Sequence, residues 1–294
     1  MRILVSGGTG FIGQALCPQL AQDGHDVIVW SRQANPDVAE GIATIQRLEE
    51  LSGPDPDAVI NLAGASIADG RWTEARKRLL VDSRVETTGK LVEWMRAMAS
   101  PPKALISASA VGYYGEQGDR VITEDTPPTS GFTHDLCAQW ENEARKAEAL
   151  GVRVCLVRTG VVLGRDGGAL AKMLLPFKMG AGGRLGSGEH YFPWIHRADI
   201  VGIYQWLVEN EQAVGAYNAS APKPVTNAEF TRALGRALKR PTLLPMPEPV
   251  LRLLFGEMSE LLLVSNRMMP KRLMDEGFAF RYPELKQALH AILS

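Results

Sequence analysis

A strand, a glycine-rich turn and the start of a helix follow one another within the first thirteen residues, and this succession limits the fold more than any other feature. Ile3, Leu4 and Val5 form an apolar run without alternation, which is typical of a strand covered on both faces. The glycines after it permit positive φ angles and close approach of the backbone, and the next helix presents unpaired N–H groups to the turn. The sequence therefore predicts a site for a pyrophosphate.

Two glycine spacings overlap in this turn. Gly8, Gly10 and Gly13 fit G-x-G-x-x-G, whereas Gly7, Gly10 and Gly13 fit G-x-x-G-x-x-G. A glycine triplet alone is weak evidence, but this one follows a buried-type strand directly and precedes a helical pattern that ends at Gly24. The context favours a dinucleotide site over a glycine turn without a ligand.

The composition excludes several classes of protein. The 294 residues are enough for one large or two small domains, and the formal net charge of −1 gives no overall attraction to nucleic acid or to an anionic membrane. Cys17, Cys137 and Cys155 are too few and too scattered for a disulfide framework or a metal site. No signal peptide is recognisable, and no apolar run reaches the ~18 residues of a membrane span. We expect a cytoplasmic protein without a bound metal.

The end of the second predicted strand, Asp26–Trp30, bears on the choice of cofactor. A ribose-binding acid is expected about 20 residues after the glycines, but the chain reads Ser31-Arg32-Gln33 there. A hydroxyl and a guanidinium suit a 2′-phosphate, which a carboxylate would repel. The sequence therefore favours NADP over NAD; the alternative is that Arg32 is only a solvated loop residue.

Strands and helices alternate up to about residue 164. Strands are predicted at Ala58–Leu62, Ala104–Ile106 and Val152–Val157, and long helices at Thr73–Met98 and Thr133–Leu150. A weak strand is possible at 44–46. Five strands with helices between most of them predict the α/β class, a Rossmann-type, doubly wound parallel sheet with right-handed connections.

The regular alternation ends after residue 164. Five glycines in Gly180–Gly188 indicate a lid or a linker, Asp199 is a natural N-cap for a following helix, and Gly215–Ala219 suggests a short strand. Thr226 and Glu229 form a capping box for a helix. We expect an NADP-binding Rossmann domain at 1–165, to which about 196–220 return, a smaller substrate-side region with a lid at 166–240, and a C-terminal appended segment at 241–294.

Several motifs, in this order and with these separations, resemble the extended short-chain dehydrogenase/reductase superfamily: Ser6-Gly7-x-x-Gly10-x-x-Gly13, Asn61-Leu62-Ala63-Gly64, Ser107-x-Ser109, Arg158-Thr159-Gly160-Val161 and His196-x-x-Asp199. More narrowly, the chain is similar to the atypical branch usually labelled "epimerase family protein". That similarity lies in the glycine-rich run Gly182–Gly188 before Trp194-Ile195-His196, and in an ending with Met269-Pro270-Lys271-Arg272-Leu273 and Gly277-Phe278.

The resemblance covers nearly the whole chain and implies an NAD(P)-binding fold. It places the glycine turn on the pyrophosphate, Ser31 and Arg32 at the 2′-phosphate, and the ends of two further strands beside the nicotinamide and its ribose. Arg84 falls where relatives tend to place an asparagine; it could reach the cofactor or a substrate carboxylate, or be an exposed helix arginine. The implied cofactor-binding residues are Gly7, Thr9, Gly10, Phe11, Ile12, Gly13, Ser31, Arg32, Leu62, Ala63, Gly64, Arg84, Thr159, Gly160 and Val161.

The chain departs from the superfamily at the catalytic positions. Active members use a serine or threonine with Tyr-x-x-x-Lys, in which the lysine lowers the pKa of the tyrosine and binds the nicotinamide ribose. Ser109 matches the serine, but Thr133 and Cys137 stand at the tyrosine and lysine positions. A threonine hydroxyl is too weak an acid, and a thiol supplies no positive charge.

Three other residues are left as candidates for moving the proton. Tyr113 and Tyr114 follow Ser109 on the same loop, and His134 begins the helix that normally carries the pair. Ser109, Tyr113 and His134 are the predicted catalytic residues, although a histidine at a helix start is often only a polar surface residue. We read His196 with Asp199 as a structural pair or cap.

Two functions are compatible with these residues. The first is an NADP(H)-dependent oxidoreductase or sugar-nucleotide-type epimerase with a degenerate Tyr-x-x-x-Lys pair, acting on an unknown small molecule. The second is a non-catalytic NADPH-binding regulatory or interaction protein on the same fold. Partners among nucleic acids and membranes are not expected. The oligomeric state stays open, with a dimer as one alternative.

Overall fold

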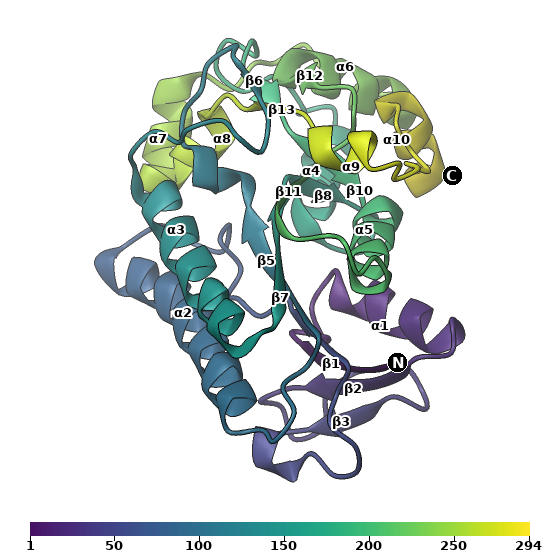
Figure 1. The fold of residues 1–294 in the computed structure, drawn as a ribbon. Helices are drawn as coiled ribbons and strands as arrows, with labels where there is room; N and C mark the ends of the chain where they lie inside the picture. Colours follow the sequence, from purple (N-terminus) through teal and green to yellow (C-terminus); the bar gives the residue numbers. More distant parts are fainter.

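The computed structural model describes all residues from Met1 to Ser294, and its centre is a seven-stranded parallel sheet (Figure 1). The strand order is β11-β7-β5-β4-β1-β2-β3, so the chain winds outward in both directions from β1. This confirms the predicted doubly wound α/β fold. The strands are β1 (Arg2–Ser6), β2 (Asp26–Trp30), β3 (Ala43–Ile45), β4 (Ala58–Asn61), β5 (Ala104–Ala110), β7 (Arg153–Thr159) and β11 (Gly215–Ala219).

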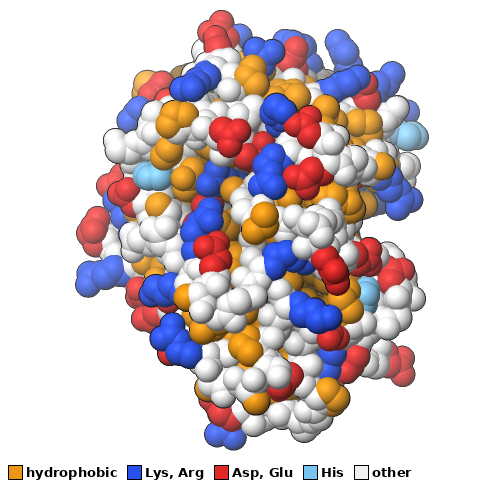
Figure 2. Space-filling view, viewed as in Figure 1, with side chains coloured by type: hydrophobic (Ala, Val, Ile, Leu, Met, Phe, Trp, Pro, Cys, Tyr) orange, Lys and Arg blue, Asp and Glu red, His pale blue; other side chains and the backbone are white.

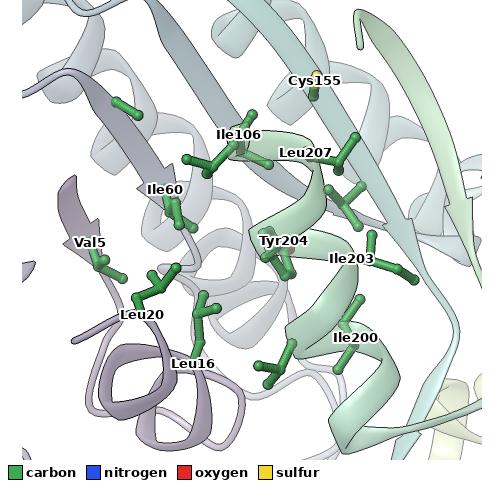
Figure 3. Close-up of a cluster of buried hydrophobic side chains, with 14 of the residues drawn as sticks. Val5, Leu16, Leu20, Ile60, Ile106, Cys155, Ile200, Ile203, Tyr204 and Leu207 are labelled. Atoms are coloured by element: carbon green, nitrogen blue, oxygen red, sulfur yellow. The ribbon is translucent and has the colours of Figure 1, made fainter. Parts of the chain in front are cut away.

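Helices cover both faces of the sheet. On one face lie α1 (Gly13–Gln22) and α5 (Arg197–Glu209), and on the other lie α2 (Glu74–Arg96) and α3 (Phe132–Arg145). Successive residues of a strand contribute side chains alternately to the apolar layers on the two faces of the sheet. Ile3 and Val5 pack with α1 and α5, whereas Leu4 packs with α2 and α3. In Figure 3, side chains of the strands and of α1 and α5 meet in the first of these layers. Burial on both faces explains why the strands read as continuous apolar runs.

The helix boundaries follow local capping chemistry, with one correction. The hydroxyl of Thr73 caps α2 by accepting from Arg76 N, and a capping box of Thr226 and Glu229 starts α6 (Asn227–Leu238), as predicted. The N-cap of α5, however, is His196 and not Asp199: Nδ1 of His196 accepts from Ala198 N at 2.9 Å. The prediction for Asp199 was wrong because its carboxylate is engaged elsewhere.

The carboxylate of Asp199 holds the C-terminal part of the chain. It accepts hydrogen bonds from the backbone N–H groups of Arg281 (2.6 Å) and Tyr282 (3.1 Å). Burial raises the pKa of Asp199, and these two bonds act in the opposite direction. A residue expected to start a helix therefore serves as a long-range anchor.

The remaining elements form a smaller region above the carboxyl ends of the strands. Its apolar core joins α4 (Gly168–Lys178), α6 and α10 (Leu285–Leu293). Three two-stranded sheets lie around it: β8 (Val161–Leu163) with β10 (Trp194–His196), β9 (Tyr191–Phe192) with β12 (Val225–Thr226), and β6 (Val121–Ile122) with β13 (Arg267–Met268). The other elements are η1 (Leu48–Glu50), η2 (Val111–Tyr114), η3 (Lys146–Leu150), α7 (Glu248–Phe255), η4 (Gly256–Ser259), α8 (Glu260–Leu263) and α9 (Lys271–Asp275).

The surface carries charges of both signs. Basic and acidic side chains alternate over the face shown in Figure 2, in agreement with a formal net charge of −1. None of the helices combines the length and the apolar character that crossing a membrane requires.

Candidate functional site

The glycine turn between β1 and α1 is seated directly on the chain that leaves β4. Gly7 has a φ of +72°, and a Cβ there would lie 2.7 Å from the carbonyl carbon of Leu62. A Cβ at Gly13 would lie 2.5 Å from the Cα of Gly8, and one at Gly8 would lie 2.7 Å from the side chain of Val29. Only glycine permits these approaches. The predicted turn therefore has the close backbone packing that its spacing implied.

The start of α1 leaves backbone donors free. No side chain caps the helix, and the N–H groups of Phe11, Ile12 and Gly13 donate to no acceptor in the protein. Unpaired N–H groups and the positive end of the helix dipole at one place suit an anion.

The side chain of Phe11 fixes the turn against the smaller region. A Cβ at Gly164, Gly167 or Gly168 would come within 3.0 Å of its ring, so the backbone of these three glycines packs directly against the ring. The guanidinium of Arg197 lies 4.8 Å from the ring centre and pairs with Asp166 at 2.9 Å. The segment after β8 is thus shaped by a residue of the glycine turn.

The carboxyl end of β2 carries no acid. Ser31 N donates to Ile45 O, and the Ser31 hydroxyl accepts from Gln33 N at 3.3 Å. Arg32 is exposed and forms no ion pair. Its charge is therefore available to a ligand at this edge.

Polar side chains connect the carboxyl ends of the central strands. Asn61 accepts from the Ser6 hydroxyl at 2.6 Å and donates to the Thr88 hydroxyl at 2.8 Å and to the Ser107 hydroxyl at 3.2 Å. Trp140 Nε1 also donates to the Thr88 hydroxyl, at 3.1 Å. This buried network holds α2 and α3 on the strand ends and so fixes the chain at Leu62–Gly64.

Ser109 lies at the end of β5, as predicted, but its hydroxyl belongs to a second buried network. It donates to Oε1 of Glu141 at 2.7 Å, and the same carboxylate is held by Arg158. Nη1 of Arg158 donates to the Tyr114 hydroxyl, which donates to Asn218 Oδ1 at 2.6 Å. The hydroxyl hydrogen of Ser109 is thus already engaged with a carboxylate.

Sequence reasoning missed Glu141 and Arg158 as partners. The signal was present: Arg158 follows the apolar run of β7 directly, and an arginine buried at such a place requires a buried acid. Glu141 lies on the inner face of α3, where its side chain is 3% exposed. Only the fold shows that these two faces meet.

Tyr113 and His134 lie next to each other above this network. Nδ1 of His134 is 2.7 Å from the carbonyl oxygen of Tyr113, so Nδ1 carries a hydrogen and donates it to this oxygen. The two rings meet edge to face at 5.4 Å, and the Tyr113 ring lies 3.4 Å from the Arg158 guanidinium carbon. The structure brings together the two predicted acid/base candidates that are not buried.

Thr133 and Cys137 face the same loop but supply no chemistry of the expected kind. A Cβ at Gly112 would lie 3.0 Å from Cβ of Thr133 and 3.6 Å from Sγ of Cys137. Burial raises the pKa of Cys137 to about 12, so the thiol stays protonated near neutral pH. Neither residue provides a cation.

The cation at this place comes from α2. The Arg84 guanidinium lies against Gly64, where a Cβ would be 3.0 Å from Cζ, and it is 5.2 Å from the Trp140 ring. The prediction left open whether Arg84 is an exposed helix residue; it is half-buried at the end of β4.

The carboxyl end of β7 is closed by the chain before β10. Val161 N donates to Pro193 O at 2.6 Å, and a Cβ at Gly160 would lie 2.4 Å from the same oxygen. Thr159 donates its hydroxyl to Val157 O at 3.1 Å. Thr159–Val161 therefore form an ordered wall beside the strand ends.

A segment of residues 65–72, which we call the strap, leaves β4 and reaches two other parts of the molecule. Asp69 pairs with Lys172 of α4 at 2.5 Å, and Arg71 donates to the carbonyl oxygens of Leu253 and Leu254 in α7. The strap thus joins the sheet to both sides of the smaller region.

Comparison with known proteins agrees with this geometry. A model described as the NAD dependent epimerase/dehydratase family matches residues 3–220, and one described as a domain of unknown function matches residues 246–292. The mouse epimerase family protein SDR39U1 is 41% identical over 298 residues, with 100% of both chains covered.

Solved structures show the same fold. The crystal structure of human epimerase family protein SDR39U1 (isoform 2) with NADPH matches with a TM-score of 0.91 and 39% identity, over 100% of this chain and 99% of that one. UDP-glucose 4-epimerase of Thermus thermophilus, in complex with NAD, matches with a TM-score of 0.80 and 20% identity, over 100% and 98% of the two chains. The second match concerns the fold alone.

Proposed function

Since this chain belongs to the NAD dependent epimerase/dehydratase family, we propose that it binds NADP(H) and transfers hydride to or from a small carbonyl or hydroxyl substrate. The observation that carries the proposal is the glycine turn seated on Leu62, with three free N–H groups at the start of α1. The NADPH complex of the human relative, 39% identical, supports the same assignment.

The proposed cofactor site runs along the carboxyl ends of β1, β2, β4 and β7. The free N–H groups at Phe11–Gly13 suit the pyrophosphate, and Ser31 with Arg32 suits a 2′-phosphate. The chain after β4 and the wall after β7 would flank the nicotinamide half. The residues proposed to bind are Gly7, Thr9, Gly10, Phe11, Ile12, Gly13, Ser31, Arg32, Leu62, Ala63, Gly64, Arg84, Thr159, Gly160 and Val161.

Titration of the purified protein with NADPH and NADH tests this assignment. We expect NADPH to bind at least tenfold more tightly, and Arg32→Ala to remove most of that difference, because a charge-assisted contact to phosphate is worth roughly 1.5–3 kcal/mol. Arg120→Ala removes another exposed, unpaired arginine and serves as the matched control. Equal affinity for the two cofactors would refute the NADP assignment.

The nicotinamide, when bound, supplies or accepts the hydride, and the protein has to move the proton. We assign this role to Tyr113 with His134, because the Ser109 hydroxyl is engaged by Glu141. Ser109 then has only its oxygen left for a substrate, and it would accept a hydrogen bond from a substrate hydroxyl. If a turnover assay is established, Tyr113→Phe and His134→Ala should each lower the rate at least tenfold; unchanged rates in both would remove the assignment.

A second function, an NADPH-binding regulator without turnover, is favoured by one specific observation. Cys137 is a buried, protonated thiol, and Ser109 is held in an ion-pair network, so the usual serine, tyrosine and lysine set is not assembled. The nicotinamide absorbance of the NADPH complex, followed with a panel of carbonyl and nucleotide-sugar compounds, decides between the two. Oxidation of NADPH with any compound of the panel supports the enzyme. The absence of oxidation with every compound supports the regulator.

The three cysteines suit a reducing compartment. Cys17, Cys137 and Cys155 are buried and unpaired. We therefore propose an intracellular place of action, as expected from the sequence.

A further inference from the structure

Four basic side chains gather at the end of α6, and none of them is paired with an acid. All four are exposed and take part in no ion pair; they are Arg232, Arg236, Lys239 and Arg240. In Figure 2, Lys and Arg side chains gather over α6. The cluster shares no residue with the site proposed for the cofactor, so it needs an explanation of its own.

The surroundings of these cations supply no negative charge. Between Glu229 and Glu248 the chain has four basic residues and no acidic one. Glu229 itself is held at the other end of α6, where its carboxylate accepts from the backbone N–H of Thr226. The two helices that pack on α6, α4 and α10, contain no aspartate or glutamate. Like charges one helical turn apart destabilise a helix, so the cluster is unfavourable until an anion binds.

The backbone of Lys239 adopts a conformation that normally belongs to glycine. Its φ is +54° and its ψ is 44°, and every other residue with a positive φ is a glycine. Lys239 N donates to Arg236 O at 3.1 Å, and Arg240 N donates to Gly235 O at 2.9 Å. These are the two bonds of a Schellman motif, in which a lysine is less stable than a glycine at this position. The exception to the use of glycine thus adds a cation to the cluster.

The chain after α6 folds back and leaves a depression between the cations. A Cβ at Gly235 would lie 2.4 Å from the side chain of Thr242, so the missing side chain lets this segment pack on the helix. The depression has a volume of about 280 Å³, close to the lower end of small-molecule sites, which span roughly 300–1,000 Å³. Its lining has no aromatic side chain and consists of Arg232, Gly235, Arg236, Lys239, Arg240, Pro241 and Thr242. It can therefore present N–H donors to an oxyanion, but it has no ring on which a nucleobase could stack.

We propose that this depression binds a small molecule that carries two or more phosphate groups. Guanidinium groups bind phosphate through two parallel hydrogen bonds, and a lysine adds a point charge. Several phosphates match a group of four cations better than one phosphate does. A nucleic acid or an anionic membrane requires a wider basic surface, whereas acids alternate with bases over the rest of the face in Figure 2 and the formal net charge is −1.

A purely structural role for the four cations makes different predictions. Positive charges in the last turn of a helix interact favourably with the helix dipole. The substitutions would then change the stability of the free protein and leave its affinity for phosphates as it is. Lys239→Gly separates the two roles, because it relieves the backbone and removes a cation at the same time.

The experiment uses the full chain and inorganic tripolyphosphate as the probe, with saturating NADPH to occupy the proposed cofactor site. Isothermal titration calorimetry measures the affinity of wild type, Arg236→Gln and Lys239→Gly for the probe. Lys90→Gln removes an exposed, unpaired cation of α2 and is the matched control. Sodium chloride at the same ionic strength corrects for screening, and thermal unfolding without the probe reports on the fold.

We expect Arg236→Gln and Lys239→Gly each to weaken tripolyphosphate binding at least about fivefold, and Lys90→Gln to change it less than about twofold. Without the probe, Lys239→Gly should unfold at a higher temperature than wild type. A structural role cannot produce this loss of binding together with a gain in stability.

Three results would overturn the proposal: no binding of tripolyphosphate beyond the effect of sodium chloride, unchanged affinity in both cluster variants, or equal losses in these variants and in Lys90→Gln. Binding of a single-stranded oligonucleotide but not of tripolyphosphate, lost in the cluster variants, would assign the cluster to nucleic acid instead. None of the substituted residues belongs to the proposed cofactor site. Failure to bind NADPH would therefore contradict the proposed function and leave the comparison of the variants intact.

Discussion

Glu141 and Arg158 form a two-pronged ion pair in the interior, with Nε to Oε1 at 2.8 Å and Nη2 to Oε2 at 2.9 Å. Their side chains are 3% and 4% exposed. Burial by itself lowers the pKa of Arg158, but the carboxylate outweighs it and the pKa stands above its ordinary value. The pair fastens α3 to β7 and takes up the hydroxyl of Ser109.

Breaking this pair should be costly. Glu141→Gln leaves the charge of Arg158 buried and uncompensated, and we expect the free energy of unfolding to fall by about 3–5 kcal/mol. Urea denaturation measures it. Glu248→Gln, which breaks the exposed pair of Glu248 with Arg252, should cost less than about 1 kcal/mol. Similar costs for the two variants would contradict this account.

A side chain added in the glycine turn should weaken cofactor binding, whereas one added at a glycine outside the turn should not. Gly7→Ala adds a Cβ that meets the Leu62 backbone at 2.7 Å, so the turn must move and NADPH affinity should fall at least tenfold. Gly41→Ala is the matched control, because Gly41 also has a positive φ, +84°, and nothing lies within 4 Å of an added Cβ. It should cost about 1–2 kcal/mol of stability and leave NADPH binding intact. Equal loss of affinity in both variants would show that the turn's contact with Leu62 is irrelevant.

The cap of α5 should make stability depend on pH. Burial, assisted by Arg197 and Arg281, lowers the pKa of His196 from 6.5 to about 4. Because folding lowers this pKa, the stabilisation is complete above pH 6.5 and is lost progressively as the pH falls toward 4. We expect a loss of about 2 kcal/mol at about pH 5 relative to pH 7, beyond that of His196→Asn, which keeps a capping group without titrating.

Urea denaturation of both proteins at the two pH values checks this prediction. Asp199 and Glu124, whose pKa values are raised by burial, contribute with the opposite sign but are common to both proteins. An unchanged difference between wild type and variant would mean that His196 does not titrate in this range.

Two substitutions of Glu124 should show whether its side chain is needed as a hydrogen-bond acceptor or for its negative charge. Its Oε1 accepts from the backbone N–H groups of Asn218 (3.1 Å) and Arg272 (3.2 Å), whereas its Oε2 is buried without a partner. Glu124→Gln keeps an acceptor and removes the charge, so stability at pH 7 should change by less than about 1 kcal/mol or rise. Glu124→Ala orphans both N–H groups and should cost about 2–3 kcal/mol. Denaturation in urea measures both; a larger loss for the glutamine variant would refute the argument.

Much of the fold was predictable because it rests on local signals. The apolar runs located the five central strands, and the edge strands β3 and β11 were suggested at 44–46 and 215–219. The short sheets were not predicted: β6 and β13 have two residues each, and their pairing depends on the fold of the chain between them. No periodicity can appear in two residues.

The candidate site was predictable in its backbone and not in its side-chain partners. Glycine spacing predicted a turn with close backbone approach, and the structure shows Gly7 packed on the chain after β4, where a Cβ would not fit. The capture of Ser109 by Glu141 had no such signal, since it depends on how α3 lies across β5 and β7. Which residues bind the cofactor or move the proton stays a prediction.

The pairing of β6 with β13 has a consequence for the order in which the protein can be completed. Val121 and Ile122 are synthesised well before their strand partners, Arg267 and Met268. The hydrogen bond from the backbone N–H of Arg272 to Oε1 of Glu124 likewise forms only after Arg272 has been synthesised. The loop after β5, with Tyr113 and Tyr114 at its start, therefore stays without its final contacts until residues 267–272 have been synthesised. A nascent chain could therefore form the glycine turn long before it could form the final contacts of this loop.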